Sequence, residues 1–526
     1  MFPMPLHHLR NFFLVLLSSL LLVLSFPKFE HGVFAWVGLL PLLIAIHDKS
    51  LRYGFFLSLV CGILFFLGIF YWILEVQGYT LFHHGLLAIY LGLYLGLFGF
   101  VFNFILKWVN ILAALLAAPF IWVSLEYIRS NLSFLALPWS LLGHSQYRYP
   151  IVIQIACLAG TYGVSFLIVL VNAALASLFI GIGRQKKPLS SEPWKVQGRF
   201  ALVTPATLLL ILTFLYGYVA LTHTITGNKI KIALAQGNIE QAKKWDPRYA
   251  RHIMQTYSEL TEQAASNQPS LIIWPETATP GSISLDPIVY AQIKDIANKS
   301  KTYLLLGSAQ HQKFEGKEAK GIQYLNSAYL ISPDPEVIKN QRYDKIHLFP
   351  FGEYLPFKEI IPWWLINVRD SGSYTAGKEF TIFKLPAYSF GVTICWENVF
   401  PDIVRQAVKR GAQFIVNITN EARFGKTAAP YQLAAISVFR AVENRIFVIR
   451  CANTGVSCII DPYGRMINRI KDERGQDIFI RGILSEWVVP LESKTFFTQY
   501  GDWSVWVSCS GLGLFLLMAF LKWLKQ

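Results

Sequence analysis

Three side chains of this 526-residue chain could together carry out nucleophilic chemistry. Two of them follow short apolar segments, and the third lies in a loop. Glu276 follows the apolar segment 271–274, Lys345 lies in a loop rich in aromatic residues, and Cys395 follows the segment 391–394. A thiol is a nucleophile, a carboxylate in an apolar setting can hold and pass on its proton, and an ammonium can stabilise a tetrahedral oxyanion. Side chains at the ends of sheet strands in α/β folds point into a common crevice, so we expect the three to meet.

The segment around Cys395 predicts a strand followed by a turn and a helix. Residues 390–394 have strand character, and residues 402–410 have helical spacing, with Gly411 as the end. A cysteine on such a turn has an exposed sulfur and nearby backbone N–H groups, a setting that lowers a thiol pKa and can hold an oxyanion. Taken alone, such a cysteine is more often a small buried core residue. The other two side chains also have plain interpretations, because a glutamate can cap a turn and a loop lysine can be solvated.

The composition indicates a membrane protein with a long polar insert. Hydrophobic residues make up 54% of the chain, and the excess lies before residue 223 and after residue 502. No small-x-small cleavage site follows the first apolar run, so we expect this run to be retained as a span. Eight runs are expected to span the membrane: 11–26, 31–47, 53–74, 86–106, 111–129, 158–182, 200–222 and 503–521.

The basic residues predict the orientation of these spans. Much of the net charge of +15 lies in short loops, where it sets topology and need not indicate nucleic-acid binding. An even number of spans places both termini on one side, and the loops of that side carry most of the charge. The opposite short loops carry only Lys28, Arg129 and Arg148. The termini are therefore expected in the cytoplasm and the insert outside. The cytoplasmic basic residues would be Arg10, Lys49, Arg52, Lys107, Arg184, Lys186, Lys187, Lys195, Arg199, Lys522 and Lys525.

Three domains are expected from this pattern: a bundle of about seven spans over 1–227, an extracytoplasmic catalytic domain over 228–490, and a last span with a cytoplasmic tail over 491–526. In the insert, short apolar β-rich runs alternate with polar helical stretches, which predicts an α/β domain of about 260 residues with its own core. The expected strands are 230–236, 271–274, 303–306, 328–331, 391–394, 414–417, 446–450 and 456–460, and the expected helices are 248–266, 287–299, 402–409 and 431–444. The six cysteines show no spacing typical of a disulfide framework or a zinc site.

The motifs around the three reactive side chains resemble those of a known family. Trp274-Pro-Glu276, the segment 345–354 (Lys-Ile-His-Leu-Phe-Pro-Phe-Gly-Glu-Tyr) and Cys395-Trp-Glu397 are similar to the Glu-Lys-Cys triad motifs of the nitrilase, or carbon–nitrogen hydrolase, superfamily. With eight flanking spans, the resemblance narrows to the apolipoprotein N-acyltransferase family. It implies a multi-pass α-helical membrane bundle of about eight spans with an inserted nitrilase-like α-β-β-α sandwich domain.

The resemblance also implies an activity and a location. The family N-acylates the N-terminal S-diacylglyceryl cysteine of apolipoproteins, with phospholipid as acyl donor, by a ping-pong mechanism through a thioester. We expect phosphatidylethanolamine as donor, a diacylglyceryl apolipoprotein as acceptor, contact with membrane lipid, no nucleic acid, no metal or other cofactor, and a monomer. The expected location is the bacterial cytoplasmic (inner) membrane, with the catalytic domain on the periplasmic side.

The resemblance carries roles to matching positions. Cys395 would attack the donor ester, Glu276 would be the general base and then the acid, and Lys345 would stabilise the oxyanion. Glu353 would orient the lysine or the base, and Glu397 matches the glutamate two residues after the nucleophile. Three further residues match family segments, at the start of the domain and in the aromatic-proline loop of the bundle: Gln236, Trp245 and Trp139.

Two departures from the family pattern concern lipid contact more than catalysis. Trp396 stands where the family usually has tyrosine, so the ring remains and the hydroxyl is lost. Arg423 replaces a tryptophan in the segment 420–425, beside Phe424, where it could pair with a donor head-group phosphate or simply be tolerated. The apolar segment 360–365 and the pair Arg423–Phe424 could dip into the membrane interface as lids, or form covered apolar patches.

Two other functions remain open at this stage. A membrane-anchored amidohydrolase could use the same triad, although a thioester waits for an amine only where water is excluded. A transport or scaffold protein could use the domain only for binding. Against it, the spans show neither charged pairs nor the broken repeats of transporters, and Glu75 and Glu126 are expected at the membrane interface.

Overall fold

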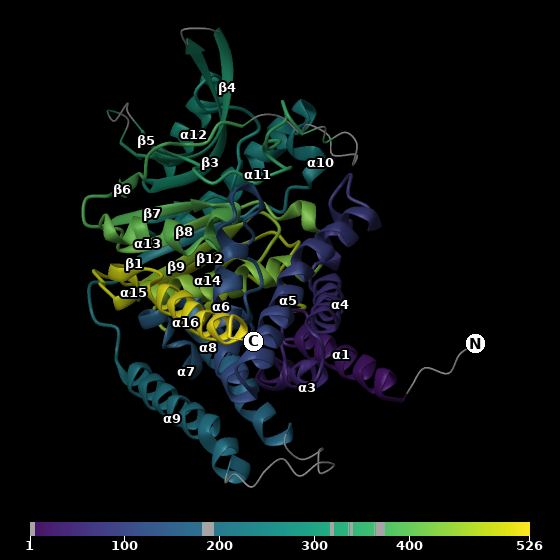
Figure 1. The fold of residues 1–526 in the computed structure, drawn as a ribbon. Helices are drawn as coiled ribbons and strands as arrows, with labels where there is room; N and C mark the ends of the chain where they lie inside the picture. Colours follow the sequence, from purple (N-terminus) through teal and green to yellow (C-terminus); the bar gives the residue numbers. More distant parts are fainter. Residues whose placement is uncertain are drawn as a thin grey trace. The chain divides into compact units, whose positions relative to one another are not determined.

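The computed structural model describes residues 6–180, 194–315, 320–334, 336, 340–361, 363 and 374–525. The chain forms two compact units (Figure 1). The helical unit comprises Met1–Leu74, Tyr79–His223 and Tyr500–Gln526, and the α/β unit comprises Glu75–Gly78 and Thr224–Gln499.

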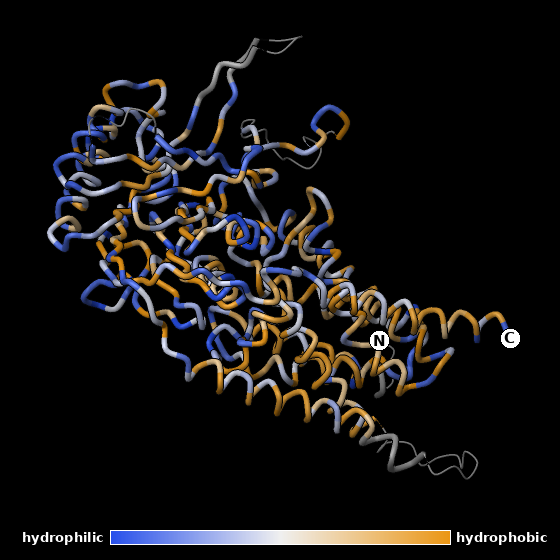
Figure 2. Tube along the Cα trace, turned by 90° about the vertical axis from the view of Figure 1, so that its left-hand side faces the viewer, coloured by the Kyte–Doolittle hydropathy of each residue, from blue (hydrophilic) through white to orange (hydrophobic). Residues whose placement is uncertain are grey.

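The helical unit is a membrane bundle. Among the described residues, six helical segments are long and apolar enough to cross a membrane, and they are drawn mostly in orange in Figure 2. Two further apolar segments, Leu9–Leu24 and Gly32–Ile46, are shorter. The predicted bundle is therefore confirmed, with the first two of the eight predicted runs shorter than a full span. The helices are α1 (Leu6–Leu24), α2 (Ala35–Gly38), α3 (Leu40–Ile46), α4 (Leu51–Ile69), α5 (Leu81–Trp108), α6 (Ile111–Asn131), α7 (Pro150–Ile153), α8 (Ala156–Phe179), α9 (Trp194–Thr222, apolar over Ala201–Thr222) and α16 (Trp503–Trp523).

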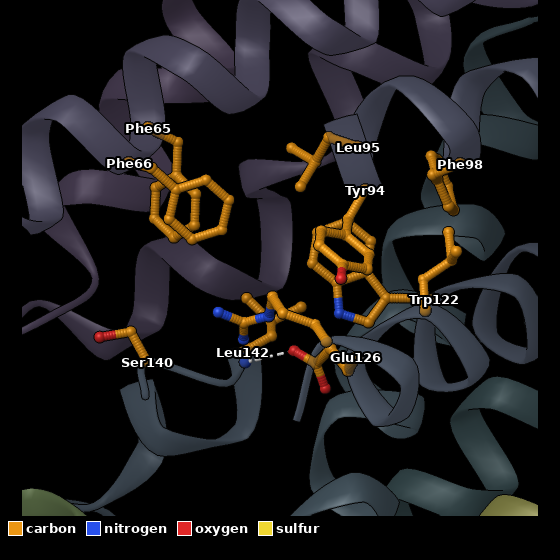
Figure 3. A pocket seen from close by; sticks show the side chains of 11 residues that line it. Phe65, Phe66, Tyr94, Leu95, Phe98, Trp122, Glu126, Ser140 and Leu142 are labelled. Carbon is orange, nitrogen blue, oxygen red and sulfur yellow. Dashed lines mark hydrogen bonds between the residues drawn. The ribbon is translucent and has the colours of Figure 1, made fainter. Parts of the chain in front are cut away.

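Two charged side chains of α6 lie inside this bundle. Glu126 and Arg129 are only 6% and 3% exposed. The Glu126 carboxylate accepts the Leu142 N–H at 2.7 Å, and the Arg129 guanidinium donates to the Trp139 carbonyl at 3.0 Å. The carboxylate lines a cavity of about 30 Å³ whose other walls are mostly aromatic and aliphatic side chains. Figure 3 shows these side chains. Both charges are buried because the loop after α6 folds into the bundle and its backbone needs polar partners there. The interfacial position of Glu126 and the absence of charged pairs in the spans stay predictions.

The α/β unit contains two six-stranded sheets. In the first, the order is β12-β1-β2-β3-β4-β5, with β1, β2 and β3 parallel and the other pairs antiparallel. In the second, the order is β11-β10-β9-β8-β7-β6, with β7, β8 and β9 parallel. The strands of the first sheet are β1 (Ile230–Gln236), β2 (Leu271–Ile273), β3 (Tyr303–Glu315), β4 (Lys320–Ile331), β5 (Gln341–Asp344) and β12 (Gly482–Val488). Those of the second are β6 (Ile382–Lys384), β7 (Ser389–Ile394), β8 (Phe414–Thr419), β9 (Phe447–Ala452), β10 (Cys458–Ile460) and β11 (Met466–Arg469).

The two sheets pack face to face, and helices cover their outer faces. Leu234 and Ile273 of the first sheet share one buried cluster with Phe390, Val416 and Ile449 of the second. Helices α11 and α12 bury their apolar faces on the other side of the first sheet, while α13 and α14 contact β7 and β9. The parallel strands are covered on both faces, which explains their continuous apolar sequences. The predicted α-β-β-α sandwich is confirmed. Its helices are α10 (Gln241–Lys244), α11 (Ala250–Ala265), α12 (Pro287–Ser300), α13 (Pro401–Lys409) and α14 (Ala429–Asn444), followed by α15 (Phe496–Tyr500).

Candidate active site

The three reactive side chains come from strand ends of both sheets. Glu276 lies three residues beyond β2, Lys345 directly follows β5, and Cys395 directly follows β7. Glu276 and Lys345 are buried, and the Lys345 Nζ lies 4.0 Å from the Glu276 Oε1. Both charges are close enough to the Cys395 sulfur to shift its ionisation. The structure thus brings together a thiol, a carboxylate and an ammonium at one place in the sandwich.

Hydrogen bonds fix the orientation of the Glu276 carboxylate. Its Oε1 accepts the Asn326 Nδ2 at 2.8 Å, and its Oε2 accepts the Asn420 N–H at 2.8 Å. The Nζ of Lys244 donates to the backbone carbonyl of Glu276 at 2.8 Å. A carboxylate held at both oxygens keeps one geometry during proton transfer, as a general base requires.

Lys345 is held as an ammonium by a second glutamate. Its Nζ donates to the Glu353 Oε1 at 2.8 Å, while the Glu353 Oε2 accepts the Phe349 N–H at 2.7 Å. Burial opposes the charge of Lys345, but Glu353, with smaller contributions from Cys395 and Glu276, raises its pKa above the ordinary value. Burial likewise opposes the charge of Glu353, and the Lys345 ammonium outweighs it and lowers the Glu353 pKa. Both partners therefore remain charged at neutral pH.

The nucleophile candidate sits at a strained point of the backbone. Cys395 has a φ of 55°, in the left-handed region that costs energy for a residue with a Cβ, and it begins the 3₁₀ turn Cys395–Val399. Its carbonyl accepts the Asn417 Nδ2 at 3.1 Å. Burial raises the pKa of the thiol to about 11, Glu276 raises it further, and Lys345 opposes the rise. The expected lowering of this pKa is therefore wrong for the resting site. Because the sulfur is enclosed, the thiol keeps its proton and needs a base.

Glu397 ties the strand of the nucleophile to the loop of the lysine. It is fully buried, and its carboxylate accepts the Tyr343 hydroxyl at 2.9 Å and the N–H groups of Ile346 and His347 at 2.7 and 3.0 Å. Its other oxygen accepts the Ile394 N–H at 2.8 Å. Burial raises the pKa of Glu397 to about 7, against the hydrogen bonds that lower it. Glu397 therefore positions the residues on either side of the site.

The other predicted site residues occupy different environments. The Trp396 indole donates to the His347 carbonyl at 3.1 Å, and its ring packs edge-on against Phe349 and Phe400. Arg423 and Phe424 lie next to each other in the 3₁₀ turn Ala422–Phe424, where Arg423 is exposed and Phe424 is buried.

The other three predicted lipid-binding residues are Gln236 and Trp245 in the α/β unit and Trp139 in the helical unit. Gln236 is buried and bonded to the Ile480 carbonyl and the Ser457 hydroxyl, so it supports the domain interior. Trp245 is 50% exposed just beyond α10, and Trp139 is buried in the helical bundle. Of the predicted lid 360–365, residues 362, 364 and 365 lie outside the described residues, as do Arg184, Lys186 and Lys187, and the side chains of Lys195 and Arg199 are likewise outside.

A polar network behind the site was not predicted. Arg450 is buried, forms an ion pair with Glu421, and donates to the Asn417 Oδ1 at 2.6 Å. Asn417 in turn donates to the Cys395 carbonyl, so the network supports the strained turn. Neither the ion pair nor Asn326 has a local sequence signal. Asn417 lies at the end of a predicted strand, which is the same signal that pointed to Cys395.

Comparison with known proteins identifies the family of the chain. Residues 231–487 match the carbon-nitrogen hydrolase family, and residues 18–174 match the apolipoprotein N-acyltransferase N-terminal domain. The apolipoprotein N-acyltransferase of Geobacter metallireducens is 35% identical over 98% of this chain and 96% of its own, and that of Chlorobaculum tepidum is 30% identical over 98% and 97%. Among solved structures, an amidase from Nesterenkonia sp. is 20% identical, with a TM-score of 0.38 over 54% of this chain and 97% of its own. From the two family matches and the full-length relatives, this chain belongs to the apolipoprotein N-acyltransferase family and is an acyltransferase.

Proposed function

We propose that the protein moves an acyl chain from a phospholipid to the α-amino group of the N-terminal S-diacylglyceryl cysteine of apolipoproteins. The reaction proceeds in two half-reactions through a thioester on Cys395. The observation that carries the proposal is the meeting of three groups: the Cys395 thiol, a carboxylate held by hydrogen bonds at both oxygens, and a lysine bonded to a second glutamate.

In the first half-reaction, the Cys395 sulfur attacks the ester carbonyl of the donor while Glu276 takes the thiol proton. A base is needed because the thiol pKa of about 11 leaves almost no thiolate at neutral pH. The Lys345 ammonium stabilises the oxyanion. The carbon–oxygen bond then breaks, Glu276 gives its proton to the leaving glyceryl oxygen, and the lysophospholipid departs.

In the second half-reaction, the acceptor amine attacks the thioester carbon and the carbon–sulfur bond breaks. Glu276 takes a proton from the nitrogen and gives it to the departing Cys395 thiolate. The two substrates react in turn, so ping-pong kinetics are expected. Exclusion of water protects the thioester from hydrolysis until the amine arrives.

The same proposal places the protein in the inner membrane, with the α/β domain on the periplasmic side and both termini in the cytoplasm. The domains are 1–227, 228–490 and 491–526. Phosphatidylethanolamine is the proposed donor, with its phosphate near Arg423 and its apolar parts against Phe424 and Trp245. Trp139 is proposed as a separate lipid-binding residue of the helical unit. The protein is proposed to act as a monomer, without a cofactor.

The test is the intact mass of the detergent-purified protein after incubation with phosphatidylethanolamine. We expect a gain of one acyl chain that hydroxylamine removes, that a diacylglyceryl peptide acceptor also removes, and that Cys395→Ser abolishes. The matched control is Cys509→Ser, a cysteine of α16 in the helical unit, which should acylate as wild type does. No adduct with any phospholipid would refute the proposal, and release of free fatty acid with no transfer to the peptide would favour the amidohydrolase.

A further inference from the structure

A second lysine faces the site, and among the described residues no carboxylate side chain bonds to it. Lys244 ends the short helix α10, is only 4% exposed, and makes one hydrogen bond within the part of the chain that the structure describes, from its Nζ to the Glu276 carbonyl. An ammonium has three N–H donors, and burying donors without acceptors is costly. A neutral amine has one donor fewer and a free lone pair. The environment of Lys244 therefore favours the neutral amine more than the environment of Lys345 does, where a carboxylate accepts from the ammonium.

The groups that face Lys244 come from three other segments. They are Glu276 beyond β2, Cys395 beyond β7 and Arg423 of the 3₁₀ turn after β8. Burial lowers the pKa of Lys244 to about 7, Glu276 and Cys395 oppose this fall, and Arg423 adds to it. The two lysines are thus shifted in opposite directions. Lys345 stays an ammonium, whereas Lys244 can gain and lose a proton near neutral pH, and such pairs mark a division between charge stabilisation and proton transfer.

In the second half-reaction, the acceptor nitrogen loses two protons, and the Glu276-Lys345-Cys395 triad can accept only one of them. An α-amino group with a pKa of about 7.7–8.0 enters mostly as an ammonium. It must lose one proton before its nitrogen can attack and a second when the amide forms. Glu276 can pass one of these to the departing thiolate. The other needs an acceptor that is unprotonated at neutral pH and close to Cys395.

We propose that Lys244 is a second catalytic base that takes this proton from the acceptor's α-ammonium, an inference that rests on the proposed function. The Lys244 amine becomes an ammonium, and the freed nitrogen lone pair forms the carbon–nitrogen bond at the thioester carbon. The carbon–sulfur bond breaks and its electron pair leaves with sulfur. One of the two protons still on the nitrogen reaches the thiolate through Glu276, and the other stays on the amide product. Lys244 then releases its proton to solvent. The donor half-reaction has no such excess proton and does not need Lys244.

A purely structural role would have different consequences. In a purely structural role, the hydrogen bond from Lys244 to the Glu276 carbonyl would position Glu276 and do nothing else. Glu276 works in both half-reactions, so loss of positioning would slow acylation and transfer together. Loss of a base for the acceptor would slow transfer alone.

The experiment separates the two half-reactions in the full-length protein. Lys244→Met removes both the base and the hydrogen bond, and Lys244→Gln retains an N–H donor for the Glu276 carbonyl but cannot take up a proton. Lys243→Met is the matched control, because this neighbour is exposed and pairs with Glu240. The rates measured are acyl-enzyme formation with phosphatidylethanolamine, and decay of the preformed acyl-enzyme with a diacylglyceryl peptide or with hydroxylamine, which is uncharged at neutral pH.

We expect acylation near the wild-type rate in Lys244→Gln and Lys243→Met. Transfer to the peptide should slow by about 100-fold or more in both Lys244 variants, the usual contribution of a general base. Lys244→Met also loses the bond to Glu276, so its transfer should slow by more than its acylation. Decay with hydroxylamine should stay near wild type, because this nucleophile has no ammonium proton to lose. Wild-type transfer should rise with pH through about 7. In Lys244→Gln the rise should move up to about 7.7–8.0, where the α-amino group loses its proton without a base.

Three results would overturn the inference: transfer at the wild-type rate in Lys244→Gln, equal slowing of both half-reactions in both variants, or equal slowing with peptide and hydroxylamine. The wild-type protein separates this inference from the proposed function. If the wild type forms no acyl-enzyme, the proposed function fails and the inference fails with it. If the wild type acylates and transfers normally while the Lys244 variants match it, the inference alone fails.

Discussion

Replacing Glu353 by glutamine should make the donor half-reaction sensitive to alkaline pH. Glu353 supplies the largest attraction that keeps Lys345 charged, against burial, which favours the amine. The Lys345 Nζ lies 2.8 Å from the Glu353 Oε1. At an effective dielectric constant of about 20, two unit charges at that distance attract by about 6 kcal/mol. A glutamine keeps an oxygen acceptor for Lys345 but removes the charge, so this value is an upper limit for the loss.

The sign of the effect follows from the charge state. The pKa of Lys345 is raised in the folded protein, so its ammonium persists well above neutral pH in the wild type. Without the Glu353 charge, burial dominates and this pKa falls. The oxyanion then loses its ammonium as the pH rises, and acylation of Cys395 slows on the alkaline side while remaining fastest at acidic and neutral pH.

The assay is the rate of acyl-enzyme formation across the pH range, measured by intact mass. The control is the double variant Glu353→Gln/Lys345→Arg, because a guanidinium stays protonated throughout this range. Its rate is expected to be lower, since arginine does not reproduce the geometry of lysine, but free of the alkaline decline. A pH profile of Glu353→Gln parallel to that of the wild type, or an alkaline decline that persists in the double variant, would refute the reasoning.

Two further predictions concern the support and the ionisation of the nucleophile. Arg450→Met should lower the free energy of unfolding by about 3–5 kcal/mol, because it leaves Glu421 as an unpaired buried charge. The double variant Arg450→Met/Glu421→Leu should recover much of this loss. Thermal unfolding in detergent measures both variants, and an Arg450→Met protein as stable as the wild type would contradict the expectation. In a Cys509→Ala background, the rate of Cys395 alkylation by iodoacetamide should be low at neutral pH and increase as the pH approaches the thiol pKa of about 11. Glu276→Gln should increase this rate, because it removes a carboxylate that raises the thiol pKa. Rapid labelling at neutral pH without the Glu276 substitution would contradict the burial argument.

Much of the fold follows from local sequence patterns. The central parallel strands β1, β2, β7, β8 and β9 are apolar runs between polar helical stretches, and the sequence predicts each within one or two residues of its observed bounds at most ends. Strands β5, β6, β11 and β12 were not predicted, because they are short or partly exposed and lack a continuous apolar run. Strand β12 is defined by its pairing with β1, which lies far away in the sequence.

The candidate site divides in the same way. Glu276, Lys345 and Cys395 could be selected from residue type, position after apolar runs and motif resemblance. The residues that hold these three side chains by hydrogen bonds could not be selected in this way. Asn326 lies within β4 and donates to both Glu276 and Glu353, a double contact that exists only once strands of one sheet and the following loops are assembled. The same holds for Glu126, which the sequence places near the end of a span and the fold buries.

Local patterns were enough to predict the class of protein, its two kinds of domain and the three reactive residue types, because hydropathy, strand length and motif spacing are local properties of the chain. The tertiary structure decided the protonation of those residues, because desolvation and charge pairing depend on which segments enclose a side chain. Lys244 and Lys345 have the same side chain and the same ordinary pKa. One is enclosed without a carboxylate partner and the other is bonded to Glu353, so their pKa values move in opposite directions.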